Sequence, residues 1–343
     1  MKNQLYLFAC CCCLCFLACN STSDDTKNTA TPSSGDEEID EVTALIDEKP
    51  GDADLYRLRG EVYADREIFS EAIRDFTTAL ELDSDTAIHY MRLADAYLNN
   101  NMSFDALQVM KDAREAFPKN EEVGLRLAKY HLIVEQYMAA INLTNNIIKE
   151  HPGSAKAYLF KGMVYREMED RVSAMEALQS AVELDAELVD AWLLMGEIMG
   201  EEDLNLALTF YDNAIRAAPN QLLPTHSKAL FLHQSGRLDQ AIEVYKKAHQ
   251  MDPSASETFY NAGLLYLELD SLDGAESMFT IAIGNDPSFS KPYFYRAEVH
   301  FSREEWEEAM ADYKRTQQLN PQSRGVEQRI EEIEEKLSVQ DQG

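Results

Sequence analysis

The stretch SETFYNAGLLYLELDSLDGAESMFTIAIGNDP, residues 256–287, decides the fold. It contains two runs in which apolar and small residues recur at the three-to-four-residue period of an amphipathic helix. Phe259 and Gly263 lie in the first run, and Ala275 and Phe279 lie in the second. Pro287 ends the second run, because proline cannot continue a helix. The stretch therefore predicts a hairpin of two helices.

The same pattern occurs eight times along the chain. One alanine of each second helix recurs at steps of 34 residues with a single step of 33, at Ala72, Ala106, Ala140, Ala174, Ala207, Ala241, Ala275 and Ala309. A small residue of each first helix recurs in the same phase, at Gly60, Ala94, Ala128, Gly162, Gly196, Ala229, Gly263 and Ala297. Both series place one deletion between Gly196 and Ala207, where a turn tolerates a change of length. A fixed period of this length predicts a repeat array.

These phased residues resemble the tetratricopeptide repeat, in which aromatic, small and proline positions recur over 34 residues. The resemblance covers Ala53 to Pro321 and implies an all-α, right-handed α-solenoid of about eight helical hairpins. The implied repeats are residues 53–86, 87–120, 121–154, 155–188, 189–221, 222–255, 256–289 and 290–321. Residues 39–50 and 322–338 carry apolar stripes at helical spacing, and we expect them to form the N-terminal and C-terminal capping helices.

Composition excludes several kinds of function. The chain has 61 acidic and 31 basic residues, a formal net charge of -30, which disfavours binding to nucleic acid. All six cysteines lie between Cys10 and Cys19, so the repeats contain no thiolate metal site and no cysteine nucleophile. We find no phosphate-binding loop and no catalytic motif. The sequence therefore predicts a protein that is not an enzyme and needs no cofactor or metal.

The N-terminus predicts export and a lipid anchor. Residues 1–18 have the layout of a signal peptide, with an apolar run from Leu5 to Ala18. Phe16-Leu17-Ala18-Cys19 resembles a bacterial lipoprotein signal, which implies lipidation of Cys19, while residues 19–38 are polar and predict a disordered tether. Asn20 favours the outer membrane by the same resemblance, and Ser23-Asp24-Asp25 resembles the export signal of Bacteroidetes surface lipoproteins. The sequence leaves open whether the protein faces the periplasm or the outside.

The repeat family implies a concave groove lined by the first helix of each hairpin. Carried over by position, the apolar lining is Leu125, Leu132, Leu159, Met163, Leu193, Leu230, Tyr260, Leu264, Leu267, Phe294 and Phe301. The first two repeats contribute mostly charged residues instead. A groove of this kind suits a partner helix or extended segment. The alternative is that some of these side chains fill the space between tightly packed first helices.

Some members of the family bind a C-terminal carboxylate with a clamp of Lys, Asn and Arg side chains. The matching positions in the first three repeats include Glu61 in place of an Asn and Glu122 in place of a Lys, which excludes the clamp there. The leading hypothesis is a scaffold or adaptor for a protein partner in the cell envelope, held at the membrane by its N-terminal lipid alone. Within this hypothesis, resemblance to known lipoproteins of this type implies an adaptor for peptidoglycan enzymes or a pilotin-like assembly factor. The alternative is a periplasmic chaperone.

Overall fold

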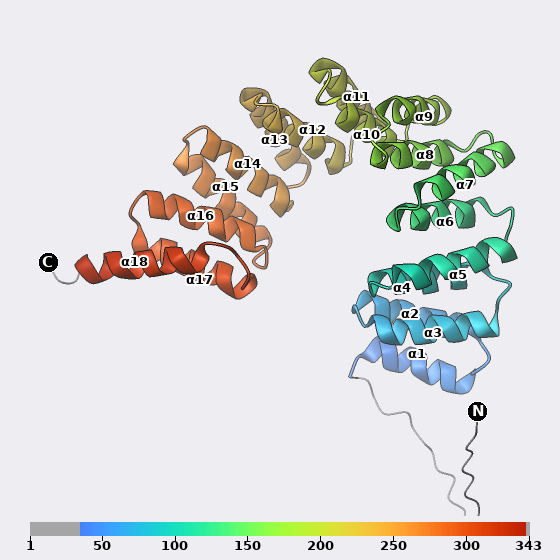
Figure 1. Ribbon diagram of the computed structural model, residues 1–343. Coiled ribbons are helices and arrows are strands. Elements are labelled where there is room, and N and C mark those ends of the chain that lie inside the picture. Colours follow the sequence, from blue (N-terminus) through green and yellow to red (C-terminus); the bar gives the residue numbers. More distant parts are fainter. Residues whose placement is uncertain (1–34, 341–343) are drawn as a thin grey trace, which may run out of the picture.

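The computed structural model describes residues 35–340, and this part of the chain folds into eighteen α-helices without a β-strand. The helices form an open arch, with α1 (Glu37–Glu48) at one end and α18 (Val326–Gln340) at the other (Figure 1). Sixteen helices between them pair into eight successive hairpins. The predicted all-α solenoid of helical hairpins is thereby confirmed.

Each hairpin consists of a first and a second helix. The first helices are α2 (Ala53–Asp65), α4 (Ala87–Asn99), α6 (Glu121–Ile133), α8 (Ala155–Glu167), α10 (Val189–Met199), α12 (Leu222–Gln234), α14 (Ser256–Glu268) and α16 (Ser290–Ser302). The second helices are α3 (Phe69–Leu82), α5 (Ser103–Ala116), α7 (Tyr137–Glu150), α9 (Arg171–Leu184), α11 (Leu204–Ala217), α13 (Leu238–Met251), α15 (Leu272–Asn285) and α17 (Trp306–Leu319).

Small residues let the two helices of a hairpin approach closely. Phe76 of α3 is 2% exposed and its ring lies against Gly60 of α2. A methyl group added at Gly60 would lie 2.7 Å from Cε1 of Phe76, closer than carbon atoms can pack. Gly263 and Phe279 repeat the arrangement in the seventh hairpin. The phased series of small residues in the sequence thus marks the contact between the two helices.

The turn within each hairpin explains the single step of 33 residues. In seven of the eight hairpins this turn contains a residue with positive φ: Glu67, Asn101, Glu135, Glu169, Gly236, Asp270 and Glu304. The fifth hairpin has none, and Gly200 there keeps a φ of -57°. Its first helix, α10, has 11 residues, whereas α8 and α12 each have 13. The missing residue is absorbed where α10 ends and its turn begins.

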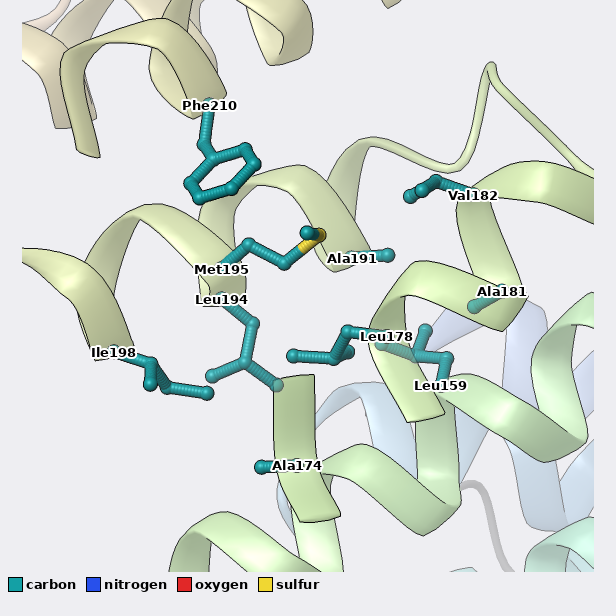
Figure 2. Close-up of a cluster of buried hydrophobic side chains, with 10 residues drawn as sticks. All are labelled: Leu159, Ala174, Leu178, Ala181, Val182, Ala191, Leu194, Met195, Ile198 and Phe210. Atoms are coloured by element: carbon teal, nitrogen blue, oxygen red, sulfur yellow. The ribbon is translucent and has the colours of Figure 1, made fainter. Parts of the chain in front are cut away.

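Stacking of hairpins builds a core that runs the length of the arch. Each hairpin packs on the one before it and the one after it. Figure 2 shows one such junction, where Leu159 of α8 and Leu178 of α9 meet Leu194 and Met195 of α10. Successive first helices also pack on each other, and no comparable packing joins successive second helices between residues 35 and 340. The first helices therefore lie on the inner, concave side of the array.

Two helices close the ends of the array. In α1, Ile39 and Ile46 are buried against the first hairpin, whereas Leu45 is 42% exposed. In α18, Val326 and Ile333 are buried against the last hairpin. Each end helix covers apolar surface that a further repeat would otherwise cover.

Buried ion pairs join the two helices of the first and last hairpins. Arg59 Nε and Nη2 of α2 donate to Asp75 of α3 at 2.7 and 2.8 Å, and Asp75 is 1% exposed. Arg296 and Asp312 form the same two-bond pair between α16 and α17, at 2.7 and 2.9 Å. Two parallel hydrogen bonds fix the geometry of each pair more strictly than a single contact would.

Candidate functional site

The concave side contains a cavity that crosses five successive first helices, from α2 to α10. Its volume is about 1020 Å³. The lining residues are Glu61, Ala64, Asp65, Phe76, Arg92, Asp95, Ala96, Leu98, Asn99, Glu122, Leu125, Arg126, Lys129, Tyr130, Lys156, Leu159, Phe160, Met163, Leu188 and Asp190. The cavity is thus a groove along the array and lies across the boundaries between repeats.

The first-repeat end of the groove is charged and internally paired. Glu61 accepts from Arg57 of its own helix at 2.9 Å and from Arg92 of the next first helix at 2.7 Å. Arg126 pairs with Asp95 at 2.8 Å and with Glu122 at 3.0 Å. The arginines at the positions of the family's carboxylate clamp are therefore neutralised by acids of this chain, which accounts physically for excluding the clamp here.

Tyr130 is the buried member of this polar network. Its hydroxyl donates to Asp95 Oδ1 at 2.8 Å, and its side chain is 1% exposed. Burial and the neighbouring Asp95 carboxylate raise the pKa of the Tyr130 hydroxyl above its ordinary value. Tyr130 consequently stays neutral and acts as a fixed hydrogen-bond donor beneath the groove.

The eleven residues of the predicted apolar lining differ in burial and in whether they line the cavity. Leu125, Leu159 and Tyr260 are buried, and the remaining eight predicted residues are partly buried. Leu125, Leu159 and Met163 line the cavity. The other eight, which are not among its lining, are Leu132, Leu193, Leu230, Tyr260, Leu264, Leu267, Phe294 and Phe301. Their contact with a partner stays a prediction.

The predicted lining residues of the seventh and eighth repeats pack against neighbouring helices. Tyr260 packs against Phe289 and Tyr295 at ring-centroid distances of 5.2 and 5.8 Å, so neighbouring hairpins fill the space around it. Leu264 and Leu267 pack against the same buried cluster. Phe294 and Phe301 pack against the cluster that joins the last hairpin to α18. In the later repeats, aromatic side chains from adjacent helices thus occupy much of the inner face.

Lys156 and Phe160 are two of the lining residues that the predicted apolar set did not contain. Lys156 is the second residue of its repeat, one of the positions that line the groove by family resemblance. Phe160 lies one turn further along α8, at a position outside that rule. Lys156 was left out because the predicted set contained only apolar side chains. The exposure of Phe160 to the cavity depends on how closely α6 and α8 pack, which the sequence does not show.

Two histidines on the inner face of the sixth repeat have protein partners. His226 Nδ1 lies 2.9 Å from Thr258 Oγ1 and His226 Nε2 lies 3.3 Å from Asn261 Nδ2, while His233 Nε2 lies 3.1 Å from Glu268 Oε1. Burial lowers the pKa of the His226 imidazole. No group of three or more His, Cys, Asp or Glu suited to a metal ion occurs in the part of the chain that the structure describes.

The predicted signal peptide, Cys19 and most of the tether lie outside the described residues. Within residues 35–340, no helix combines the length and the apolar character needed to cross a membrane. The repeats themselves therefore offer no membrane-spanning segment in this range.

Family models match the chain at several places. Models described as tetratricopeptide repeat match residues 57–121, 155–188 and 260–324, and one described as TPR repeat matches residues 231–270. The chain is 24% identical over 331 residues to the DnaJ homolog subfamily C member 7 homolog of Schizosaccharomyces pombe, which covers 83% of this chain and 67% of that protein. It is 24% identical over 320 residues to the DnaJ protein P58IPK homolog B of Oryza sativa subsp. japonica, which covers 87% of this chain and 62% of that protein.

Among solved structures, the hetero-tetramer Cut9-Hcn1 of the APC/C aligns with 86% of this chain and 58% of that chain, at 14% identity and a TM-score of 0.48. The phased residues, the stacked hairpins and the matching repeat models agree with one another. The chain belongs to the tetratricopeptide repeat family.

Proposed function

We propose that the chain is a scaffold that binds a segment of a partner protein in the concave groove formed by α2 to α10. Tetratricopeptide repeat arrays serve as protein-interaction scaffolds. The observation that supports the proposal is the groove itself, with a volume of about 1020 Å³ spread over five helices. Pockets for drug-sized ligands have volumes of roughly 300–1000 Å³. The groove slightly exceeds this range and extends across five helices, so it suits a peptide segment.

A carboxylate placed on the groove wall is expected to weaken partner binding. Met163 lines the cavity and is only partly buried, so Met163→Asp introduces a charge that a bound guest must desolvate. We expect the dissociation constant of a bound partner peptide to rise by at least about tenfold, which corresponds to roughly 1.4 kcal/mol. Fluorescence anisotropy with a labelled peptide measures the change.

Val172→Asp is the matched control for this variant. Val172 is 71% exposed on α9 and does not line the cavity, so the control adds the same charge elsewhere. Val172→Asp should keep the thermal midpoint of the parent protein. Met163 also packs against the buried cluster of α8 to α10, so circular dichroism at the assay temperature must show that Met163→Asp is folded. Equal binding by the parent and Met163→Asp would exclude this groove as the binding surface.

We also propose that Cys19 carries a lipid that anchors the scaffold in a bacterial cell envelope, at the outer membrane. Support comes from the sequence: an apolar run from Leu5 to Ala18 ends at Cys19, and a polar segment follows at once. Acyl chains of this kind hold a protein on a membrane without a spanning helix. The repeats would then stand clear of the bilayer on the segment between Cys19 and α1.

Cys19→Ala is expected to abolish incorporation of an alkyne-labelled fatty acid and to release the protein from the membrane fraction. Cys15→Ala, which changes a cysteine within the apolar run, should keep both properties. Metabolic labelling followed by fractionation of the cells measures the two outcomes. Undiminished labelling of Cys19→Ala would contradict the anchor and leave the groove proposal intact.

A further inference from the structure

Ion pairs on the groove face connect successive first helices in a regular series. Arg92 Nε lies 2.7 Å from Glu61, and Arg126 Nη1 lies 2.8 Å from Asp95, each pair joining residues 31 positions apart. The pair of Arg329 with Glu298, at 3.0 Å, has the same separation at the other end of the array. An acid on one first helix thus pairs with an arginine on the helix of the next repeat.

The series stops after the third repeat, and these positions next hold an acid and an arginine at Glu298 and Arg329. Lys129 occupies the position of Glu61 and Asp95, one repeat further along, and Phe160 occupies the position of Arg92 and Arg126. At this junction a lysine stands where the earlier repeats have an acid, and a phenylalanine stands where they have an arginine. The junction of α6 and α8 therefore lacks the inter-repeat ion pair that joins α2 to α4 and α4 to α6.

Two lysines at this break have no acidic partner. Lys129 and Lys156 are both exposed and both line the cavity, and neither forms an ion pair with any residue in the described range 35–340. The arginines of the same cavity are paired with acids of this chain. Lys129 and Lys156 are therefore the two cations of this groove wall whose charge no acid of the described chain neutralises, although acids such as Glu122 and Asp190 line the same cavity.

Apolar side chains lie beside these lysines. Leu125 and Leu159 are 3% and 7% exposed, and together with Phe160 and Met163 they line the same cavity. A bound segment would bury apolar side chains on this wall and would place its charged side chains near Lys129 and Lys156. Such a lining suits a segment in which apolar and charged residues alternate around a helix or along a strand.

The charge of the bound segment is set by the side chains it contacts, even though the whole chain has a net charge of -30. Exposed charges separated by more than the screening length, about 8 Å at physiological ionic strength, interact weakly. Asp65 and Asp190 line the cavity towards its two ends, so the unpaired cations lie between acidic ends. Contact pairing with the lysines therefore favours carboxylates in the middle of the guest.

We infer that the junction of the third and fourth repeats binds an acidic, amphipathic segment of a partner protein. Its carboxylates pair with Lys129 and Lys156, and its apolar side chains pack mainly on Phe160 and Met163, which are only partly buried. The inference rests on the proposed groove function and adds the chemistry of the guest. It differs from the family's carboxylate clamp, because the cations lie at the break in the ion-pair series and a C-terminal carboxylate is not required.

A peptide selection with a charge reversal tests this inference. The full chain selects from a displayed library of random 16-residue peptides, and the enriched peptides are titrated by fluorescence anisotropy. The variants are Lys129→Glu with Lys156→Glu, and a control with Lys111→Glu and Lys149→Glu. The control lysines are exposed on α5 and α7, lie outside the cavity, and change the net charge equally.

We expect the enriched peptides to combine Asp or Glu with apolar residues. The dissociation constant should rise by about tenfold or more in the groove variant and stay within about twofold in the control. Replacing the acids of a selected peptide with lysine should restore binding to the groove variant. Enrichment of neutral or basic peptides, or equal binding by both variants, would overturn the inference while leaving groove binding intact. Failure to enrich any peptide over the Met163→Asp protein would instead contradict the proposed function itself.

Discussion

Replacing Phe279 with alanine is expected to lower the free energy of unfolding by about 3–5 kcal/mol, the usual range for a buried phenylalanine. Phe279 is 0% exposed and its ring lies against Gly263 in the same hairpin. The ring also stacks on Tyr295 of the next hairpin at 5.9 Å. Its loss leaves a cavity between the helices of one hairpin and weakens the junction with the next.

Guanidinium denaturation followed by circular dichroism measures the loss, and Ile281→Ala provides the control. Ile281 lies in the same helix but is 37% exposed, so its truncation should cost less than about 1 kcal/mol. Hydrogen exchange should show faster opening concentrated in α13 to α16, because each hairpin contacts only its neighbours. An equal acceleration of exchange in α2 to α5 would contradict this local coupling.

The second large effect concerns the carboxylate of Asp75. Asp75→Ala is expected to destabilise the array by about 3–5 kcal/mol, because it leaves the Arg59 guanidinium buried without its partner. The Arg59 side chain is 14% exposed and its Nη1 also donates to Thr43 of α1 at 3.1 Å. Hydrogen bonds donated to Asp75 raise the pKa of Arg59 above its ordinary value. Without Asp75 this rise is lost, but the guanidinium stays charged because the ordinary pKa of arginine is already far above neutral pH. One substitution therefore loosens α1, α2 and α3 together.

A double replacement distinguishes the cost of an unpaired charge from the loss of attraction. Arg59→Met with Asp75→Leu removes both charges and should recover much of the stability lost in Asp75→Ala, since no buried ion remains. Glu71→Ala is the control, because Glu71 pairs with Arg74 at the surface and such pairs contribute about 0–1 kcal/mol. Thermal and guanidinium unfolding of the four proteins give the comparison. A double variant no more stable than Asp75→Ala would show that the pair acts by attraction alone.

The fold could be predicted from the sequence because its determining contacts are local and periodic. Gly60 and Phe76 lie 16 residues apart, and the same small and aromatic pairing recurs at Gly263 and Phe279. Each copy of the pattern is a separate indication of the same hairpin, and hairpins contact only their neighbours. The deletion of one residue in the fifth hairpin changes only the end of α10 and its turn, so the later repeats keep the same spacing of small and aromatic residues.

The groove was harder to predict, because exposure on the concave side depends on how successive first helices pack. Leu125 and Leu159 occupy predicted lining positions and are nevertheless 3% and 7% exposed. Tyr260 is surrounded by rings from two hairpins, which one repeat considered alone does not reveal. The charge break at Lys129 could have been recognised from the sequence, but its meaning required the pairing of Glu61 with Arg92 across repeats.

The stacking of hairpins also has a mechanical consequence. The backbone hydrogen bonds of the repeats close within helices and turns, and packed side chains join one hairpin to the next. A small rotation at each junction therefore changes the pitch and span of the whole arch without breaking a backbone bond. A force applied between α1 and α18 is expected to extend the protein elastically before any helix unfolds. The least closely packed junction between hairpins sets the stiffness. The second helices α11 and α13 pack least closely on the hairpins that follow them, so we expect such extension to begin at the junctions on either side of the sixth hairpin.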